Sequence, residues 1–406
     1  MRKLDLQTAK GAGKSMIKEI NQKLILNLVR EHQPISRAEI SKRTRLQRST
    51  VTIISNRLLS KGWIYEGESG RYGGGRRPKH LYLNPKKLLA LGVEVGREET
   101  LLALADLNGE LIDRAYFKTT LEDPTFFTRL AKKIRSFSDH SRPRRGVEVA
   151  GVGIGLPGYI EKNSGRIIAA ENFCWMNVPA GDYLRKHLDF PIYFENVAKL
   201  AAFAELWFGK SKNGAPRNLV HITTRDGLGT GLILNGEIFN GARDGAAEFG
   251  HFSLVPDGER CVCGNYGCWE VYASDMATVK RYLQSRNGST SEPPSPEKVG
   301  IREVIEAARR GDHAARTALQ STAKYLGIGI SNLLFGLNPE LVTVGDELAG
   351  AWDLIEEEIV ATVRGRVPSY YLEGVEIGPT SLKEAPSLLG AIALVLADIF
   401  SISKQP

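Results

Sequence analysis

Three of the four cysteines in this 406-residue chain lie within eight positions, and a histidine stands ten residues before the first of them. The four residues are His251, Cys261, Cys263 and Cys268. Imidazole nitrogen and thiolate sulfur are ligands that zinc prefers, and four protein ligands leave no position for a substrate. We therefore expect a structural Zn²⁺ here, held by a loop that turns tightly at Gly264 and Gly267.

The clustered cysteines are also compatible with redox-active thiols or with a disulfide to Cys174. The chain shows neither the apolar core of a signal peptide nor a run long enough to span a membrane. We therefore expect a cytoplasmic protein, and structural disulfides are rare in that reducing compartment. Cys174 is accordingly predicted to be a buried small apolar side chain.

Two carboxylates, Glu248 and Glu270, stand on either side of the cysteine cluster and are not needed as metal ligands. The plainer interpretation is that both are ordinary surface carboxylates. Their position beside a predicted metal loop favours a different arrangement, in which the metal braces one wall of a pocket and the carboxylates face into it.

Basic residues are concentrated near the amino terminus. Residues 1–87 contain 20 Lys and Arg against 6 Asp and Glu, a net charge of +14, whereas residues 88–406 contain 34 against 40, a net charge of −6. Such asymmetry is typical of a polyanion-binding module joined to an acidic body.

The pattern of the basic module predicts a winged helix-turn-helix. Apolar residues recur at helical spacing over 17–29, and Ser36-Arg37-Ala38-Glu39 is a capping box that starts a second helix. A third helix is expected over 48–61, and two extended runs around a glycine-rich loop follow it. Polar residues of the third helix face a major groove, and paired arginines of the loop suit a minor groove. The predicted DNA contacts are Gln47, Arg48, Ser49, Thr50, Thr52, Asn56, Arg76 and Arg77.

The rest of the chain has the pattern of an α/β body. A short linker over 84–87 precedes apolar runs at 88–95 and 147–154, with a hairpin signal at Asn108-Gly109 between them. A second series of strands, glycine-rich turns and helices begins near residue 219. This repetition predicts two lobes around a central cleft.

These motifs give the chain a family resemblance. The segments 248–251, 261–270 and 219–241 resemble the ROK family of repressors, open reading frames and sugar kinases, and are most similar to its xylose, N-acetylglucosamine and glucose repressors. The resemblance covers nearly the whole chain and implies an actin-like ATPase fold behind the winged helix-turn-helix. The domains it implies are a DNA-binding domain at 1–85, a first lobe at 88–197 completed by a helix at 387–403, and a second lobe with the zinc site at 198–386.

The resemblance also implies roles for single residues. His251 would bind zinc through one ring nitrogen and touch a sugar with the other side of its ring. Glu248 and Glu270 would bind sugar hydroxyls, because an ionised carboxylate accepts several hydrogen bonds. Asn196 and the Gly158 backbone would line the same pocket, although Asn196 also fits an ordinary turn at the end of a strand.

Three departures from the kinase pattern argue against enzymatic activity. The family's kinases carry a phosphate-cradling Asp-x-Gly-Gly-Thr loop, whereas the segment from Gly96 to Thr100 here contains one glycine and two glutamates. The kinases use an Asp as general base, and its position here is Val197, which cannot accept a proton. Asp346 stands where a second glycine is usual.

The sequence therefore predicts a sugar-responsive transcriptional repressor of carbohydrate-utilisation genes. It would bind operator DNA as a homodimer or homotetramer, away from any membrane, and a sugar in the interlobe cleft would alter its affinity for the operator. Two alternatives remain: an ATP-dependent sugar kinase with a DNA-binding appendage, and a repressor controlled by a partner protein.

Overall fold

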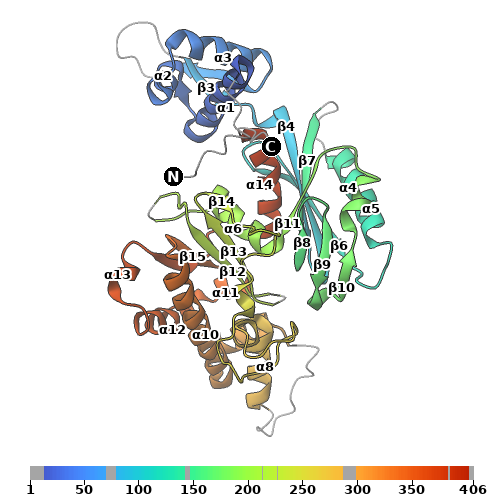
Figure 1. The fold of residues 1–406 in the computed structure, drawn as a ribbon, viewed down its shortest axis with the longest axis vertical. Coiled ribbons are helices and arrows are strands. Elements are labelled where there is room, and N and C mark those ends of the chain that lie inside the picture. The colour runs from blue at the N-terminus through green and yellow to red at the C-terminus, as the bar shows by residue number, and fades with distance from the viewer. Residues whose placement is uncertain are drawn as a thin grey trace.

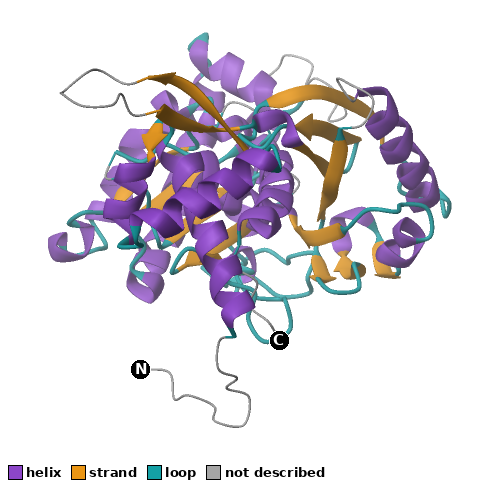
Figure 2. Cartoon of the chain, turned by 90° about the horizontal axis from the view of Figure 1, so that it is seen from above, coloured by secondary structure: helices purple, strands orange, loops and turns teal. Residues whose placement is uncertain are grey.

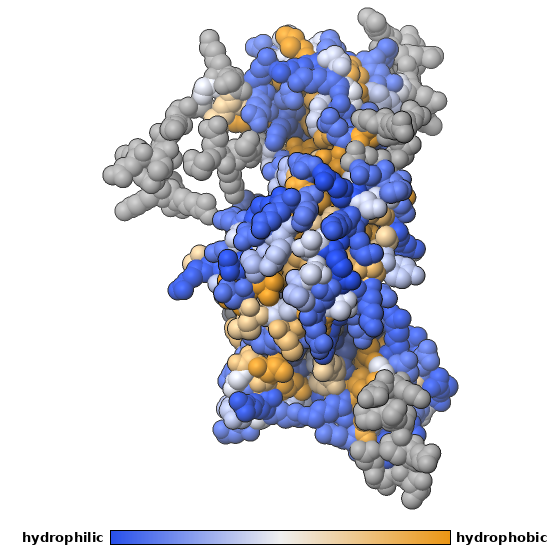
Figure 3. Space-filling view, turned by 90° about the vertical axis from the view of Figure 1, so that its right-hand side faces the viewer, coloured by the Kyte–Doolittle hydropathy of each residue, from blue (hydrophilic) through white to orange (hydrophobic). Residues whose placement is uncertain are grey.

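The computed structural model describes residues 13–69, 79–141, 147–212, 214–225, 227–286, 299–382 and 385–401. A small amino-terminal module lies above two larger lobes (Figure 1). On the face shown in Figure 3, hydrophilic residues predominate and apolar residues gather in small patches. Within the described ranges, no helix combines the length and the apolar composition that crossing a membrane requires.

The amino-terminal module is a winged helix, as predicted. Its helices are α1 (Lys14–His32), α2 (Arg37–Thr44) and α3 (Arg48–Ser60), and its strands are β1 (Ile35–Ser36), β2 (Ile64–Ser69) and β3 (Lys79–Leu83). The capping box is confirmed, because Ser36 Oγ accepts from Glu39 N and Ser36 N donates to Glu39 Oε2. The three strands pair in the order β1-β3-β2, and Figure 2 shows the module from above. Arg76 and Arg77 of the predicted wing lie outside the described residues.

The two lobes repeat one topology. The first sheet has the order β6-β5-β4-β7-β11 and the second the order β14-β13-β12-β15-β16. In each, the first, fourth and fifth strands in chain order pair in parallel, and the second pairs antiparallel with the first and third. The strands are β4 (Leu88–Val95), β5 (Glu99–Ala105), β6 (Leu111–Lys118), β7 (Glu148–Leu156), β11 (Ile192–Asn196), β12 (Leu219–Thr223), β13 (Gly229–Leu234), β14 (Glu237–Ile238), β15 (Leu341–Val344) and β16 (Glu376–Pro379).

The remaining elements cover these sheets. A small antiparallel sheet in the order β10-β9-β8 extends the first lobe. Its strands are β8 (Tyr159–Glu161), β9 (Arg166–Ala170) and β10 (Trp175–Val178). The covering helices are α4 (Phe126–Ser141), α5 (Ala180–Arg185), α7 (Glu270–Ala273), α8 (Asp275–Arg286), α9 (Ile301–Arg309), α10 (His313–Leu337), α11 (Asp346–Ala349), α12 (Trp352–Arg364) and α13 (Ser369–Leu372). Short 3-10 turns are η1 (Pro85–Lys87), η2 (Glu171–Phe173) and η3 (Phe249–His251).

Two apolar helices, α6 (Val197–Phe208) and α14 (Pro386–Phe400), pack against each other between the two sheets. Helix α14 lies on β4 and β7, whereas α6 lies on β12 and β13. Their close approach requires Gly390, because a Cβ at that position would overlap the backbone of Leu200. The core of the winged helix is continuous with this region, since Val29 belongs to the same buried apolar cluster as Leu396 and Phe400.

Candidate functional site

His251 and the three clustered cysteines come together in the second lobe. Their ligand atoms all lie within 4.8 Å of one another. The sulfurs of Cys263 and Cys268 are 3.7 Å apart, and so are Cys261 Sγ and His251 Nδ1. Tetrahedral bonds of about 2.3 Å to sulfur place neighbouring ligand atoms roughly 3.8 Å apart, so the four side chains fit around one metal ion.

The loop that carries these ligands is held by its turns and by an anchor. Gly264 and Gly267 have φ angles of 91° and 66°, as the predicted tight turns require. Trp269 is 1% exposed, and its Nε1–H donates to Tyr325 O on α10 at 2.9 Å. Burial raises the pKa of the Cys261 and Cys268 thiols, so a thiolate at either position needs a cation beside it.

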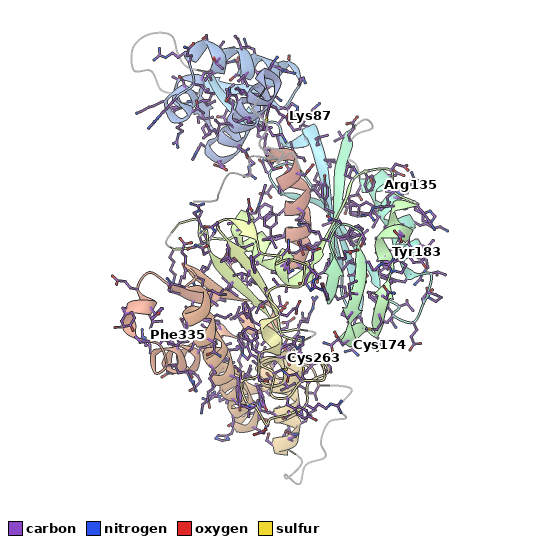
Figure 4. All side chains as sticks on the ribbon, viewed as in Figure 1. Lys87, Arg135, Cys174, Tyr183, Cys263 and Phe335 are labelled. Atoms are coloured by element: carbon purple, nitrogen blue, oxygen red, sulfur yellow. The ribbon has the colours of Figure 1, made fainter. Side chains whose placement is uncertain are left out.

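The fourth cysteine lies elsewhere. Figure 4 shows Cys174 and Cys263 on different lobes, and all four cysteines are free thiols. Cys174 is exposed, so its prediction as a buried side chain was wrong. It ends η2 with a φ of 55°, and this left-handed turn places the side chain at the surface.

A cavity of about 150 Å³ lies between the lobes, and all five predicted sugar-binding residues line it. Gly158 and Asn196 come from the carboxyl-terminal ends of the neighbouring parallel strands β7 and β11. Glu248, His251 and Glu270 come from the second lobe, around the metal-ligand loop. Residues of both lobes thus face one space.

On the first lobe, Asn196 is fixed at both ends of its amide. Its Oδ1 accepts from Ala198 N at 2.8 Å and Lys199 N at 3.2 Å, which caps α6. Its Nδ2 donates to Gly158 O at 2.8 Å. Asn196 therefore ends a strand, caps α6 and lines the cavity. Gly158 has a φ of 71°, and a Cβ there would contact Ala170.

On the second lobe, Glu270 is oriented by its neighbours, and Glu248 lies near charged groups. Glu270 Oε2 accepts from Leu228 N at 2.9 Å, and Gly227 allows this approach because a Cβ would overlap the carboxylate. Glu248 lines the cavity but is itself exposed, so the surface interpretation of this carboxylate holds beside the cavity one. Burial raises the pKa of Glu248, while the nearby charges of His251 and Lys199 act to lower it.

Further polar residues that sequence reasoning missed also line the cavity, among them Glu171, Asn172 and Arg225. Glu171 and Asn172 lie in η2, between β9 and β10, and Arg225 follows β12. Each is a single polar residue in a connection, without a motif that would distinguish it from an ordinary surface residue. Only the approach of the two lobes brings these residues to the cleft.

A second depression lies beside the cavity. It is lined in part by residues 96–99, which follow β4 and stand where the family's kinases have their phosphate loop. Arg225 Nη2 is 2.6 Å from Glu94 Oε1, so this ion pair joins the two lobes. Asp346 Oδ2 accepts from Thr224 N at 2.8 Å. Burial, followed by the charge of Asp346, raises the pKa of Asp275 to about 7. The region is therefore occupied by paired and acidic groups.

Helix α3 presents one polar face to solvent. Val51, Ile54 and Leu58 are buried against the module, as expected. Of the predicted DNA contacts, Thr50 is half-buried and the exposed ones are Gln47, Arg48, Ser49, Thr52 and Asn56. Sequence reasoning missed Ile53, which lies on the same face and is 68% exposed. Periodicity could not find it, because an isoleucine beside Ile54 looks like a core residue.

Two different family models match the amino-terminal module and the two-lobed body. The ROK family model matches residues 90–398, and the MarR family model matches residues 19–67. The xylose repressor of Caldicellulosiruptor bescii is 31% identical over 400 residues, which cover 96% of this chain and 98% of that protein.

Solved structures agree with this division. A ROK family transcriptional regulator, a homologue of the Escherichia coli MLC protein, has a TM-score of 0.80 and 25% identity over 95% of this chain and 97% of that one. A ROK family glucokinase from Streptomyces griseus, solved with glucose and AMPPNP, has a TM-score of 0.67 and 27% identity over 75% of this chain and 98% of that one. The fold is thus a two-lobed, actin-like ATPase body behind a MarR-type winged helix.

Proposed function

Because the chain belongs to the ROK family, we propose that it is a sugar-responsive transcriptional repressor of carbohydrate-utilisation genes. The observation that carries this proposal is the interlobe cavity lined by five residues from four separate segments: Gly158, Asn196, Glu248 with His251, and Glu270. The likeness to a xylose repressor and to a ROK transcriptional regulator, each over nearly the whole chain, supports it.

In this proposal the cavity binds one neutral sugar. Glu248 and Glu270 accept hydrogen bonds from its hydroxyls, and Asn196 and the Gly158 backbone contact it from the first lobe. His251 turns Nδ1 toward Cys261, so the other side of its ring is available to the cavity. A sugar held by residues of both lobes changes how the lobes lie together.

We assign Zn²⁺ to the cluster of His251, Cys261, Cys263 and Cys268. The donor set supports this choice, because three thiolates and one imidazole suit zinc better than the oxygen-seeking cations. When bound, the ion supplies positive charge that keeps the thiols ionised and holds the loop together. The loop in turn presents His251 and Glu270 to the cavity.

The proposal excludes a kinase reaction. Val197 lines the cavity at the position where a general base is needed, and the loss of such a base costs about 10²–10⁴ in rate. Arg225 is paired with Glu94 instead of a phosphate. The proposed domains are those expected from the sequence: 1–85, 88–197 with 387–403, and 198–386.

The winged helix binds operator DNA in this proposal, with α3 in the major groove and Arg76 and Arg77 in a minor groove. Gln47, Arg48, Ser49, Thr50, Thr52 and Asn56 supply polar contacts. Ile53 adds an apolar contact that suits the 5-methyl group of a thymine. The protein acts as a homodimer or homotetramer, because two half-sites bound together fix the register on DNA.

Two assays test the function together. An operator is first selected from a random DNA pool, and its affinity is measured with D-xylose, D-glucose and N-acetylglucosamine. We expect at least one sugar to weaken operator binding by about 5- to 150-fold, the usual range of coupling between two sites. A coupled ATP assay with the same sugars should show no turnover.

Each alternative has its own outcome. Robust sugar-dependent ATP turnover would establish the kinase with a DNA-binding appendage. An operator affinity that no sugar changes would favour control by a partner protein.

A further inference from the structure

The winged helix is joined to the body through α1. Lys23 Nζ donates to Ser401 O, and Asn27 Nδ2 donates to Phe400 O at 2.8 Å. The Arg30 guanidinium lies over two aromatic rings, 4.3 Å from the centroid of Trp207 and 4.7 Å from that of Phe400. The Arg30 side chain is only 21% exposed, and its Nη2 also lies 3.4 Å from Glu31 Oε1.

The two rings under Arg30 belong to two helices that pack on different sheets. Trp207 is near the end of α6, which packs on β12 and β13 of the second lobe. Phe400 ends α14, which packs on β4 and β7 of the first lobe. One side chain of the DNA-binding module therefore contacts both lobes at once.

Both helices begin at the interlobe cavity. Asn196 caps α6 and lines the cavity, together with Val197, Ala198 and Ala201. Pro386 and Ser387 open α14 and line the same cavity. Figure 1 shows α14 running from the centre of the body up to the winged helix. Each helix thus extends from the proposed sugar-binding site to Arg30.

Near their cavity ends the helices touch where Gly390 of α14 meets the backbone of Leu200 of α6. At 1.5 Å per residue, this contact is about 5 Å from the cavity end of each helix. It is about 10 Å from Trp207 and about 15 Å from Phe400 along the helix axes. A rotation about this contact is therefore amplified roughly two- to threefold at Arg30.

We propose that Arg30 couples the sugar site to the DNA-binding module, a regulation that rests on the function proposed above. A sugar held by both lobes changes the angle between α6 and α14, and Trp207 and Phe400 then move relative to each other. Arg30 cannot remain stacked on both rings, so α1 shifts with one of them. The shift changes the position of α3 and thereby the fit of paired winged helices to their half-sites.

The test compares operator affinity with and without a sugar in wild type and in Arg30→Gln. The sugar is whichever of D-xylose, D-glucose and N-acetylglucosamine most weakens wild-type binding. We expect the ratio of the two operator dissociation constants to fall to within about twofold of unity in the variant. Sugar affinity, measured by calorimetry, and operator affinity without sugar should each stay within about threefold of wild type.

Two matched variants separate the stacked guanidinium from charge alone. Lys18→Gln removes a positive charge from an exposed position on the same helix and should leave the ratio unchanged. Arg30→Lys keeps a cation over the rings but loses the planar group, so it should restore part of the ratio. If Arg30→Gln does not fold, Trp207→Leu tests the same joint from the body.

The outcomes distinguish this proposal from the proposed function. A wild-type protein without any sugar effect would overturn the function itself. A full sugar effect in Arg30→Gln would overturn the coupling role alone. Weaker operator binding in Arg30→Gln at an unchanged ratio would show that Arg30 only supports the fold, which also contradicts the proposal.

Discussion

At the scale of single residues, three polar groups of the cavity are each oriented by a second group. Leu228 N–H holds Glu270, and Asn196 is fixed between the start of α6 and Gly158 O. His251 Nδ1 faces the Cys261 sulfur, which leaves the other side of the ring toward the cleft. Acceptors that are already in position lose little entropy when a ligand binds, so the site suits tight recognition of a small polar molecule.

The metal assignment is tested by Cys263→Ser. The variant loses one ligand, so its zinc content, measured by mass spectrometry of the purified protein, should fall well below one ion per chain. We expect the melting temperature to fall by roughly 5–10 °C, because 1 kcal/mol shifts it by about 2–4 °C in a domain of this size. Cys174→Ser, at an exposed position in the other lobe, should change neither quantity. A wild-type protein purified without zinc from zinc-containing medium would refute the assignment.

At the scale of elements, α3 separates its two roles by face. Val51 and Leu58 are fully buried and hold the helix on the module, whereas Ile53 points away from it. Ile53 is exposed and, among the described residues, does not belong to the buried apolar cluster of the module. Its position favours an apolar contact with DNA.

Replacement of thymine by deoxyuridine removes the methyl group that Ile53 is expected to touch. At one or two operator positions, this change should weaken wild-type binding roughly fourfold, since a buried methyl group contributes about 0.8 kcal/mol. Ile53→Ala should show no such loss at those positions, and its affinity for the normal operator should fall by a similar factor. Ser60→Ala, an exposed change at the end of the same helix, is the control. Equal deoxyuridine effects in wild type and Ile53→Ala would contradict the contact.

At the scale of the whole molecule, the lobes meet over buried charges. The Glu94–Arg225 pair crosses the cleft, and Asp275 and Asp346 lie close to it. Burial raises the pKa of both aspartates. The ionisation state of this region therefore affects how stably the two lobes are held together.

Stability should depend on pH through Asp275, whose pKa is raised to about 7. Its pKa in the unfolded chain is about 4, so folding is penalised progressively as pH rises from about 4 to about 7 and by a constant amount above that. Asp275→Asn removes the penalty and should raise the melting temperature more at pH 8 than at pH 5. Asp189→Asn, at a side chain that is 81% exposed, should show no such difference. Equal gains for Asp275→Asn at both pH values would argue against a buried, ionising Asp275.

Local patterns in the sequence determined much of the protein. The capping box at Ser36 and the positive φ angles of Gly264 and Gly267 follow from residues a few positions apart. The proposed metal-ligand set is local too, because all four members lie within eighteen positions. The two-lobed fold was predicted from the family resemblance, which covers nearly the whole chain.

Tertiary structure alone decided the contacts between distant segments. The cavity joins Gly158 to Glu270, the cleft pairs Glu94 with Arg225, and Arg30 lies on rings from two helices. No local pattern encodes these contacts, because they depend on how two sheets and the pair α6 and α14 pack together. Cys174 was mispredicted for a different reason: its exposure depends on the left-handed turn that ends η2, whereas residue type suggested burial.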